Sequence, residues 1–150
     1  MSGRNTVYRK EVVYNELNYN NDIYLQHINS VKFLGLKFNY LINFAYLNSP
    51  MSEHTEVSCN ASGGYFAIDW KVNHSKLENR QRYLKSNDVV NLSIKNSFDN
   101  NGQIQNDKVA FLRSHDIQFT IGNDTFQEVV CHNERLGGND EWRIELIKQD

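Results

Sequence analysis

The sequence contains very little proline and cysteine and almost no excess charge. Proline occurs once among 150 residues, at Pro50, and cysteine twice, at Cys59 and Cys131. A small secreted domain stabilised by disulfides usually has more cysteines in paired spacings, so we expect two free, buried thiols. The net charge of -2 lacks the basic excess of nucleic-acid-binding proteins and of polybasic membrane anchors, so neither kind of partner is expected.

Long apolar runs are also missing. The most apolar segment, residues 33–47, is interrupted by Lys37, Asn39 and Asn43 and falls short of the roughly 20 residues that span a bilayer. The first twenty residues contain no apolar core of a signal peptide. These absences predict a soluble, cytoplasmic protein that does not insert into a membrane.

The motifs of common enzymes and metal sites are absent as well. The two cysteines are far apart in sequence, so no CxxC pair of zinc ligands exists. Neither a glycine-rich phosphate loop nor a GxSxG nucleophile motif occurs. We therefore expect no metal, no cofactor and no catalytic residue.

The sequence does contain an internal repeat. Residues 55–72 read TEVSCNASGGYFAIDWKV, and residues 127–144 read QEVVCHNERLGGNDEWRI. In both copies a Gly-Gly pair lies between a cysteine and a tryptophan, and the chain contains only two residues of each of these types. We interpret the repeated positions as structural, because recurring cysteines and tryptophans are best explained by packing and the carboxylates by polar partners. These positions are Glu56, Cys59, Trp70, Glu128, Cys131 and Trp142.

The repeat extends upstream and organises the whole chain. Phe33-Leu34 of the first copy recurs as Phe111-Leu112 of the second. Short segments rich in valine, isoleucine, tyrosine and phenylalanine, separated by turn residues, predict strands and an all-β fold. We predict one domain with an N-terminal strand, two repeat units and a linker between the units, over residues 6–14, 22–72, 88–147 and 74–87 respectively. About four strands in each unit of roughly fifty residues favour a β-trefoil.

The second unit resembles the MIR domain. The resemblance is carried by DVVNL, VAFLRSHD, QEVVCH and NDEWRIE, within residues 88–145, and more loosely by most of residues 22–147. The domain is shared by protein O-mannosyltransferases, inositol trisphosphate receptors, ryanodine receptors and stromal-cell-derived factor-two-like proteins. The resemblance implies a trefoil of three units, of which the third is degenerate or missing here. It also implies a location in the endoplasmic reticulum.

Two groups of side chains are candidates for contact with a ligand. The first, Arg113, Ser114, His115 and Asp116, follows an expected strand, so we place it on a loop, where binding residues concentrate. The second consists of residues that the first copy does not share, namely His132, Asn139 and Asp140. A metal or thiol-nucleophile site at Cys131-His132 is disfavoured, because the equivalent of His132 in the first copy is Asn60.

The function most consistent with these patterns is recognition without catalysis. We expect a MIR-type module that binds a protein partner or a glycan. One alternative is a carbohydrate-binding lectin of the trefoil type, and another is a structural or regulatory fragment of a larger MIR-containing protein. An enzyme would require Glu128, His132 and Asp140 to converge in a deep cleft.

Overall fold

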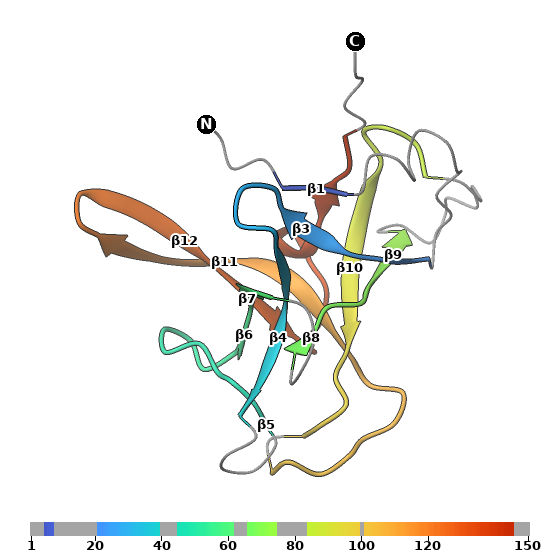
Figure 1. Ribbon diagram of the computed structural model, residues 1–150, viewed down its shortest axis with the longest axis vertical. Coiled ribbons are helices and arrows are strands. Elements are labelled where there is room, and N and C mark those ends of the chain that lie inside the picture. Colours follow the sequence, from blue (N-terminus) through green and yellow to red (C-terminus); the bar gives the residue numbers. More distant parts are fainter. Residues whose placement is uncertain are drawn as a thin grey trace.

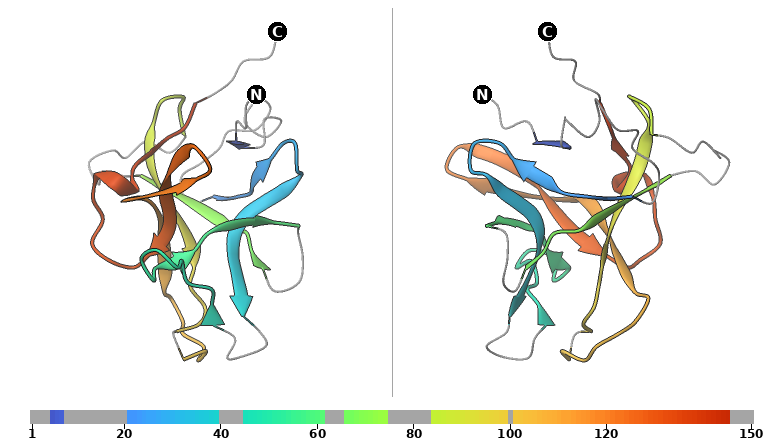
Figure 2. Two further views of the ribbon diagram at one scale, coloured as in Figure 1. Left: turned by 90° about the vertical axis from the view of Figure 1, so that its left-hand side faces the viewer. Right: turned by 45° about the vertical axis from the view of Figure 1, so that its right-hand side comes forward.

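The structure, a computed structural model, describes residues 5–7, 21–39, 45–61, 66–74, 84–99 and 101–145. Within these residues the chain forms strands and one short 3-10 helix, so the prediction of an all-β fold is confirmed. The strands form two sheets that curl into a half barrel (Figures 1 and 2). Among the described helices, none has the length and apolar character needed to cross a membrane.

The first sheet contains strands of the first predicted unit together with β1, whereas the second sheet combines strands of both units. The first sheet has the order β1 (Asn5–Val7), β3 (Leu25–His27), β4 (Lys32–Asn39) and β5 (Ala45–Tyr46), and β7 (Ser58–Asn60) and β8 (Phe66–Ala67) also pair with β4. The second has the order β2 (Asp22–Ile23), β9 (Trp70–His74), β10 (Val89–Lys95), β11 (Val109–Ile121), β12 (Asp124–His132) and β6 (Thr55–Glu56). Strand β13 (Trp142–Arg143) pairs with β10 and follows the 3-10 helix η1 (Gly138–Asp140).

Two predicted segments are described only in part. Strand β1 covers the beginning of the strand expected over residues 6–14 and pairs with β3. The remainder of that strand, and the linker between His74 and Leu84, lie outside the described residues. A third trefoil unit built from these segments therefore stays a prediction.

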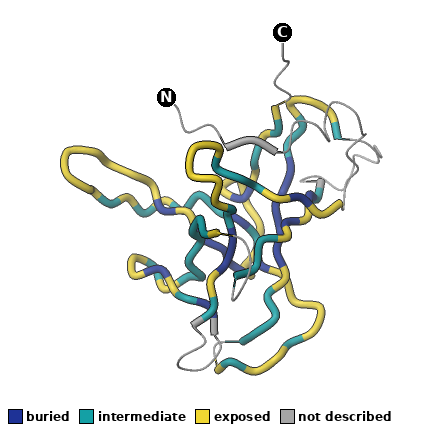
Figure 3. Tube along the Cα trace, viewed as in Figure 1, coloured by how far each residue is buried: buried dark blue, intermediate teal, exposed yellow. Residues whose placement is uncertain are grey.

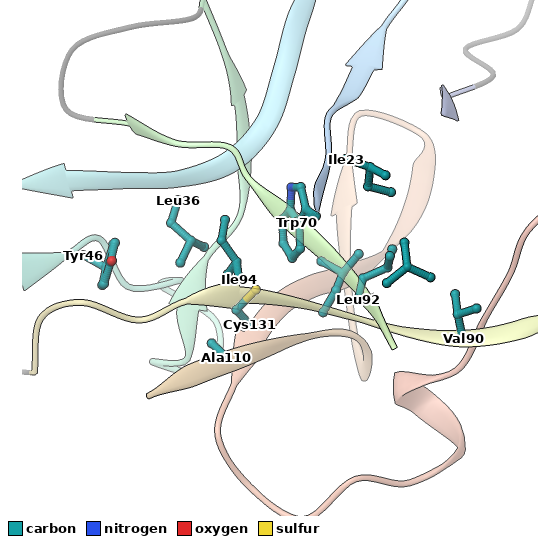
Figure 4. Packing of buried hydrophobic residues seen from close by; sticks show 11 residues of the cluster. Ile23, Leu36, Tyr46, Trp70, Val90, Leu92, Ile94, Ala110 and Cys131 are labelled. Atoms are coloured by element: carbon teal, nitrogen blue, oxygen red, sulfur yellow. The ribbon is translucent and has the colours of Figure 1, made fainter. Parts of the chain in front are cut away.

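The core lies between the sheets and is centred on β9 and β10. Trp70 and Val72 are fully buried, whereas Lys71 between them is exposed, which is the alternation of a strand with one buried face. Strand β10 is buried at most positions, because β9, β11 and β13 all pair with it (Figure 3). Figure 4 shows the side chains of Trp70, Ile94 and Cys131 packed around these strands.

Equivalent residues of the two copies make the same contacts. In both, the cysteine lies opposite a leucine of the neighbouring strand, as in the pairs Leu34–Cys59 and Leu112–Cys131. In both, the tryptophan indole donates a hydrogen bond to the carbonyl of that leucine, at 2.9 Å for Trp70 and 3.0 Å for Trp142. Both cysteines are free. The cysteine, leucine and tryptophan of each copy therefore have the same strand register and the same contacts as their equivalents in the other copy.

Candidate functional site

The segment from Arg113 to Asp116 lies inside a strand, so its expected position on a loop is wrong. Strand β11 runs without interruption from Val109 to Ile121 and pairs with β12. The pairing register shifts between Ser114 and Gln118, which marks a β-bulge or similar irregularity. Between these two pairs, three residues of β11 lie opposite one residue of β12, so the polar segment is accommodated while the strand continues.

Arg113, His132 and Asp140 form a largely buried charged group at the base of the β11–β12 hairpin. Arg113 donates to Asp140 through Nε at 2.9 Å and through Nη2 at 3.2 Å, while His132 Nε2 lies 2.6 Å from Asp140 Oδ1. The side chains of His132 and Asp140 are completely buried. Two donors from a planar guanidinium are the arrangement in which arginine holds a carboxylate most firmly. All three residues are candidates from the sequence, and the structure brings them together.

The hydrogen bonds of His132 fix its role. The backbone N–H of Glu134 donates to His132 Nδ1 at 3.0 Å, so in the neutral ring the proton is assigned to Nε2, which faces Asp140. Both ring nitrogens are therefore engaged in holding the chain after β12. Burial acts to raise the pKa of Asp140, but hydrogen bonds from Arg113, the Gly137 amide and His132 outweigh burial and lower that pKa.

A second group joins β11 and β12 to the loop that follows β5. Glu128 is almost fully buried, accepts a hydrogen bond from Ser49 Oγ, and lies 3.1 Å from His115 Nδ1. Burial tends to raise the pKa of Glu128, yet hydrogen bonds from Ser49, Ser52 and His115 lower it on balance. Glu128 therefore has its contacts in this second group, with Ser49 and His115, whereas His132 and Asp140 contact each other in the first group.

His54 and Glu134 link these two groups. His54 Nε2 lies 2.7 Å from Glu134 Oε1, which Arg113 Nη1 approaches at 3.4 Å. The rings of His54 and His115 are 5.1 Å apart. The hydrogen bond from His54 lowers the pKa of the exposed Glu134 carboxyl. The result is a continuous polar cluster that ties the loop of residues 49–54 to the hairpin base.

The remaining predicted residues lie on the rim of this cluster. Asn139 of η1 donates to Asp116 Oδ2 at 3.0 Å, and both side chains are exposed. Ser114 lies opposite Val129 in the hairpin. No group of three or more histidine, cysteine, aspartate or glutamate side chains suited to a metal ion occurs in the part of the chain that the structure describes.

Sequence reasoning missed Ser49, His54 and Glu134 as members of the cluster. The first two contact partners 79 and 80 residues away along the chain. The loop of residues 49–54, which contains Ser49, Ser52 and His54, has no local sequence pattern that predicts such a contact. Glu134 could have been found, because it lies between Cys131 and Trp142 at a position whose residue the first copy does not share.

Beyond the polar cluster, the hairpin projects away from the half barrel (Figure 1). Strands β11 and β12 are joined by a turn in which Gly122 has a φ of 62°, a left-handed conformation that favours glycine. The distal part of the hairpin is exposed nearly throughout (Figure 3). Isolated two-stranded hairpins are marginally stable in water, so this one depends on its anchored base.

One face of the projecting hairpin is apolar. Phe119 lies opposite Phe126 with ring centroids 5.9 Å apart, and Ile121 lies opposite Asp124 on the same face. Ile121 and Phe126 are 64% and 45% exposed, which is a large solvent contact for such side chains. The other face is polar and presents the pairs Gln118–Gln127 and Thr120–Thr125. We call the group of Phe119, Ile121, Asp124 and Phe126 the hairpin face.

A separate cavity of about 360 Å³ opens between the two sheets. The rings of Phe38 and Tyr46 line it together with the charged side chains of Asp69, Lys71 and Lys95. Its size falls in the range of small-molecule sites. None of the residues proposed from the sequence lines it.

Searches of protein-family models, of curated proteins and of solved structures find no match to this chain. We therefore base the functional assignment on the geometry of the polar cluster, the hairpin face and the cavity.

Proposed function

We propose that the chain is a recognition module without catalytic activity, and that it binds a protein partner through the hairpin face. The observation that carries the proposal is the exposure of Ile121 and Phe126 on a hairpin whose opposite face is polar. Apolar side chains gathered on one side of a projecting element favour a partner that removes them from water. Isolated exposed apolar residues would carry no such argument.

The polar cluster supports this proposal as the anchor of the hairpin. Its hydrogen bonds fix the base through Arg113–Asp140, His115–Glu128 and His54–Glu134. A rigid base presents the hairpin in one orientation, which reduces the entropy lost on binding. The candidate residues from the sequence would then position the binding surface, and the exposed pair Asp116–Asn139 borders it.

A displayed library of random peptides tests the proposed function. Panning against the wild-type chain should enrich peptides, and the Phe126→Ser variant should lose that enrichment. Thr120→Ala, on the polar face of the same hairpin, is the matched control and should keep it. Circular dichroism should show that both variants fold, since both positions are exposed. Enrichment that survives Phe126→Ser would remove the hairpin face as the site.

The MIR relationship and the trefoil remain part of the proposal. The shared register of the two copies supports an internally repeated fold. A cytoplasmic location is likewise a proposal, and it rests on composition alone.

A glycan is the second candidate ligand, and the cavity between the sheets favours it. Aromatic rings beside carboxylates and ammonium groups suit the apolar faces and hydroxyls of sugars, and Phe38, Asp69 and Lys71 supply such groups. A glycan array should then show binding that Lys71→Ala abolishes and Phe126→Ser leaves unchanged. If the wild-type chain binds no glycan on the array, a glycan is excluded as the ligand of this cavity.

A further inference from the structure

We infer that the partner is an extended peptide segment with alternating apolar and basic side chains, and that it adds as a strand to the outer edge of β12. This inference rests on the proposed function and specifies its partner. Three observations carry it: an open strand edge, the apolar face beside that edge, and the sign of the local charge.

The open edge lies between the tip of the hairpin and the point where β6 pairs with β12. Strand β6 covers β12 only at Val130 and Cys131, through Glu56 and Thr55. The chain then leaves the hairpin, because β7 begins at Ser58 and pairs with β4 instead. Within the described residues no strand pairs with the outer edge of β12 from Asp124 to Val129. Backbone groups along such an edge accept an added strand.

The hairpin face determines which side chains the added strand would present. Side chains of a strand alternate between the two faces of a sheet, so every second residue of the segment would lie on the face of Phe126, the aromatic residue of β12 itself. Those residues should be apolar. Contacts between directly opposed aromatic and β-branched side chains are among the stabilising pairs of sheets.

The charge of the distal hairpin selects basic residues. From Asp116 to Val129 the chain contains Asp116, Asp124 and Glu128 and no lysine, arginine or histidine. Glu128 is buried and engaged, whereas Asp116 and Asp124 are exposed at the base and the tip. Because the apolar residues of the added strand lie on the face of Phe126, its lysine or arginine side chains lie on the opposite face, and the exposed carboxylates attract them at longer range and speed the encounter.

The same charges argue against two other occupants of the hairpin face. A second copy of the chain would bring two sets of the same carboxylates together, which is unfavourable. An anionic lipid surface attracts basic segments, and this hairpin is acidic. A basic, apolar segment of another protein satisfies both the face and the charge.

Synthetic peptides of about ten residues, long enough to span the open edge, test the inference. The first alternates valine and lysine, the second alternates valine and glutamate, and the third is the first with every backbone nitrogen methylated. Fluorescence anisotropy should show binding of the first peptide, and binding weaker by about tenfold or more for the other two. Asp124→Asn should weaken binding of the valine–lysine peptide, Phe126→Ser should abolish it, and Thr120→Ala should leave it unchanged.

The outcomes separate this inference from the proposed function. Equal binding of the lysine and glutamate peptides, lost in Phe126→Ser, would overturn the charge argument and leave protein recognition standing. Binding of the methylated peptide would overturn strand addition alone. Dimers in sedimentation velocity, or binding to phosphatidylcholine vesicles, each abolished by Phe126→Ser, would assign the face to a second copy or to lipid. If no peptide binds and library panning also fails, the proposed function fails with the inference.

Discussion

The two copies of the internal repeat use the same strand register but fill it differently. Both place a leucine opposite a cysteine, and both anchor a tryptophan on the carbonyl of that leucine. Trp70 of the first copy is nevertheless completely buried, whereas Trp142 is only partly buried. The cysteines show the opposite order, because Cys131 is fully buried and Cys59 only partly. A shared contact pattern therefore does not imply equal burial.

The polar cluster arises at three positions where the copies differ in chemistry. The first copy has Gly35, Asn60 and Ile68, and the second has Arg113, His132 and Asp140 at the equivalent places. A Cβ atom on Gly35 would lie 1.9 Å from the carbonyl oxygen of Ala67, because β8 packs directly on β4. No larger side chain fits there. In the second copy η1 replaces that strand, and the arginine fills the space and holds the aspartate.

The largest expected effect comes from removing the tryptophans. Trp70→Ala should lower the free energy of unfolding by about 4 kcal/mol. Trp142→Ala should lower it by about 3 kcal/mol, because the Trp142 ring is only partly buried. Urea denaturation followed by circular dichroism measures both. A cost below about 1 kcal/mol for Trp142→Ala would show that its ring is not part of the core.

The next prediction tests whether Arg113, His132 and Asp140 stabilise the fold only as a group. Asp140→Ile should cost about 3 kcal/mol or more, because it leaves Arg113 and His132 buried without their carboxylate. Combining it with Arg113→Gly and His132→Asn, which copies the first repeat, should cost less than Asp140→Ile alone. Asp124→Asn, at an exposed position, is the control and should change stability by less than about 0.5 kcal/mol. Additive losses in the triple variant would contradict a coupled group.

Local sequence patterns predicted the residues that the two copies share. Cys59 and Cys131, with their tryptophans, were recognised because recurrence is visible in the sequence itself. The alternation of apolar residues also predicted the β class. The position of Arg113 was predicted wrongly, because a run of four polar residues resembles a loop although a bulge accommodates it in a strand.

The contacts that complete the site could not be predicted in this way. His54 and Ser49 meet the second copy only through the folded path of the chain, and no spacing encodes that path. The projecting hairpin could have been found, since Gly122-Asn123 between two apolar-rich segments is a hairpin turn pattern. The exposure of its apolar face depends on where the half barrel ends, which is a tertiary property.

The second copy should also give the protein its sensitivity to acid. The pKa values of Asp140 and Glu128 are lowered in the folded state, so both carboxylates stabilise the fold above the pKa of carboxyl groups in the unfolded chain, which is about 4. That contribution is lost as the pH falls through the lower folded-state values. Urea midpoints measured from pH 7 to pH 3 should therefore fall less steeply in Asp140→Asn than in the wild type. Parallel curves would show that Asp140 carries no net stabilisation in its ionised form.

The smallest effect concerns the two thiols and leaves stability unchanged. Burial raises the pKa of both cysteines, but Lys32 opposes that effect at Cys59, and Cys131 is completely enclosed. An aromatic disulfide reagent at pH 8 should therefore label Cys59 in the native protein, and label Cys131 only when the fold opens. A Cys59→Ala variant assigns the two phases, and adding urea should accelerate the slow one. Equal labelling rates would mean that the hairpin base opens locally around Cys131, and the anchor on which the hairpin face depends would then be loose.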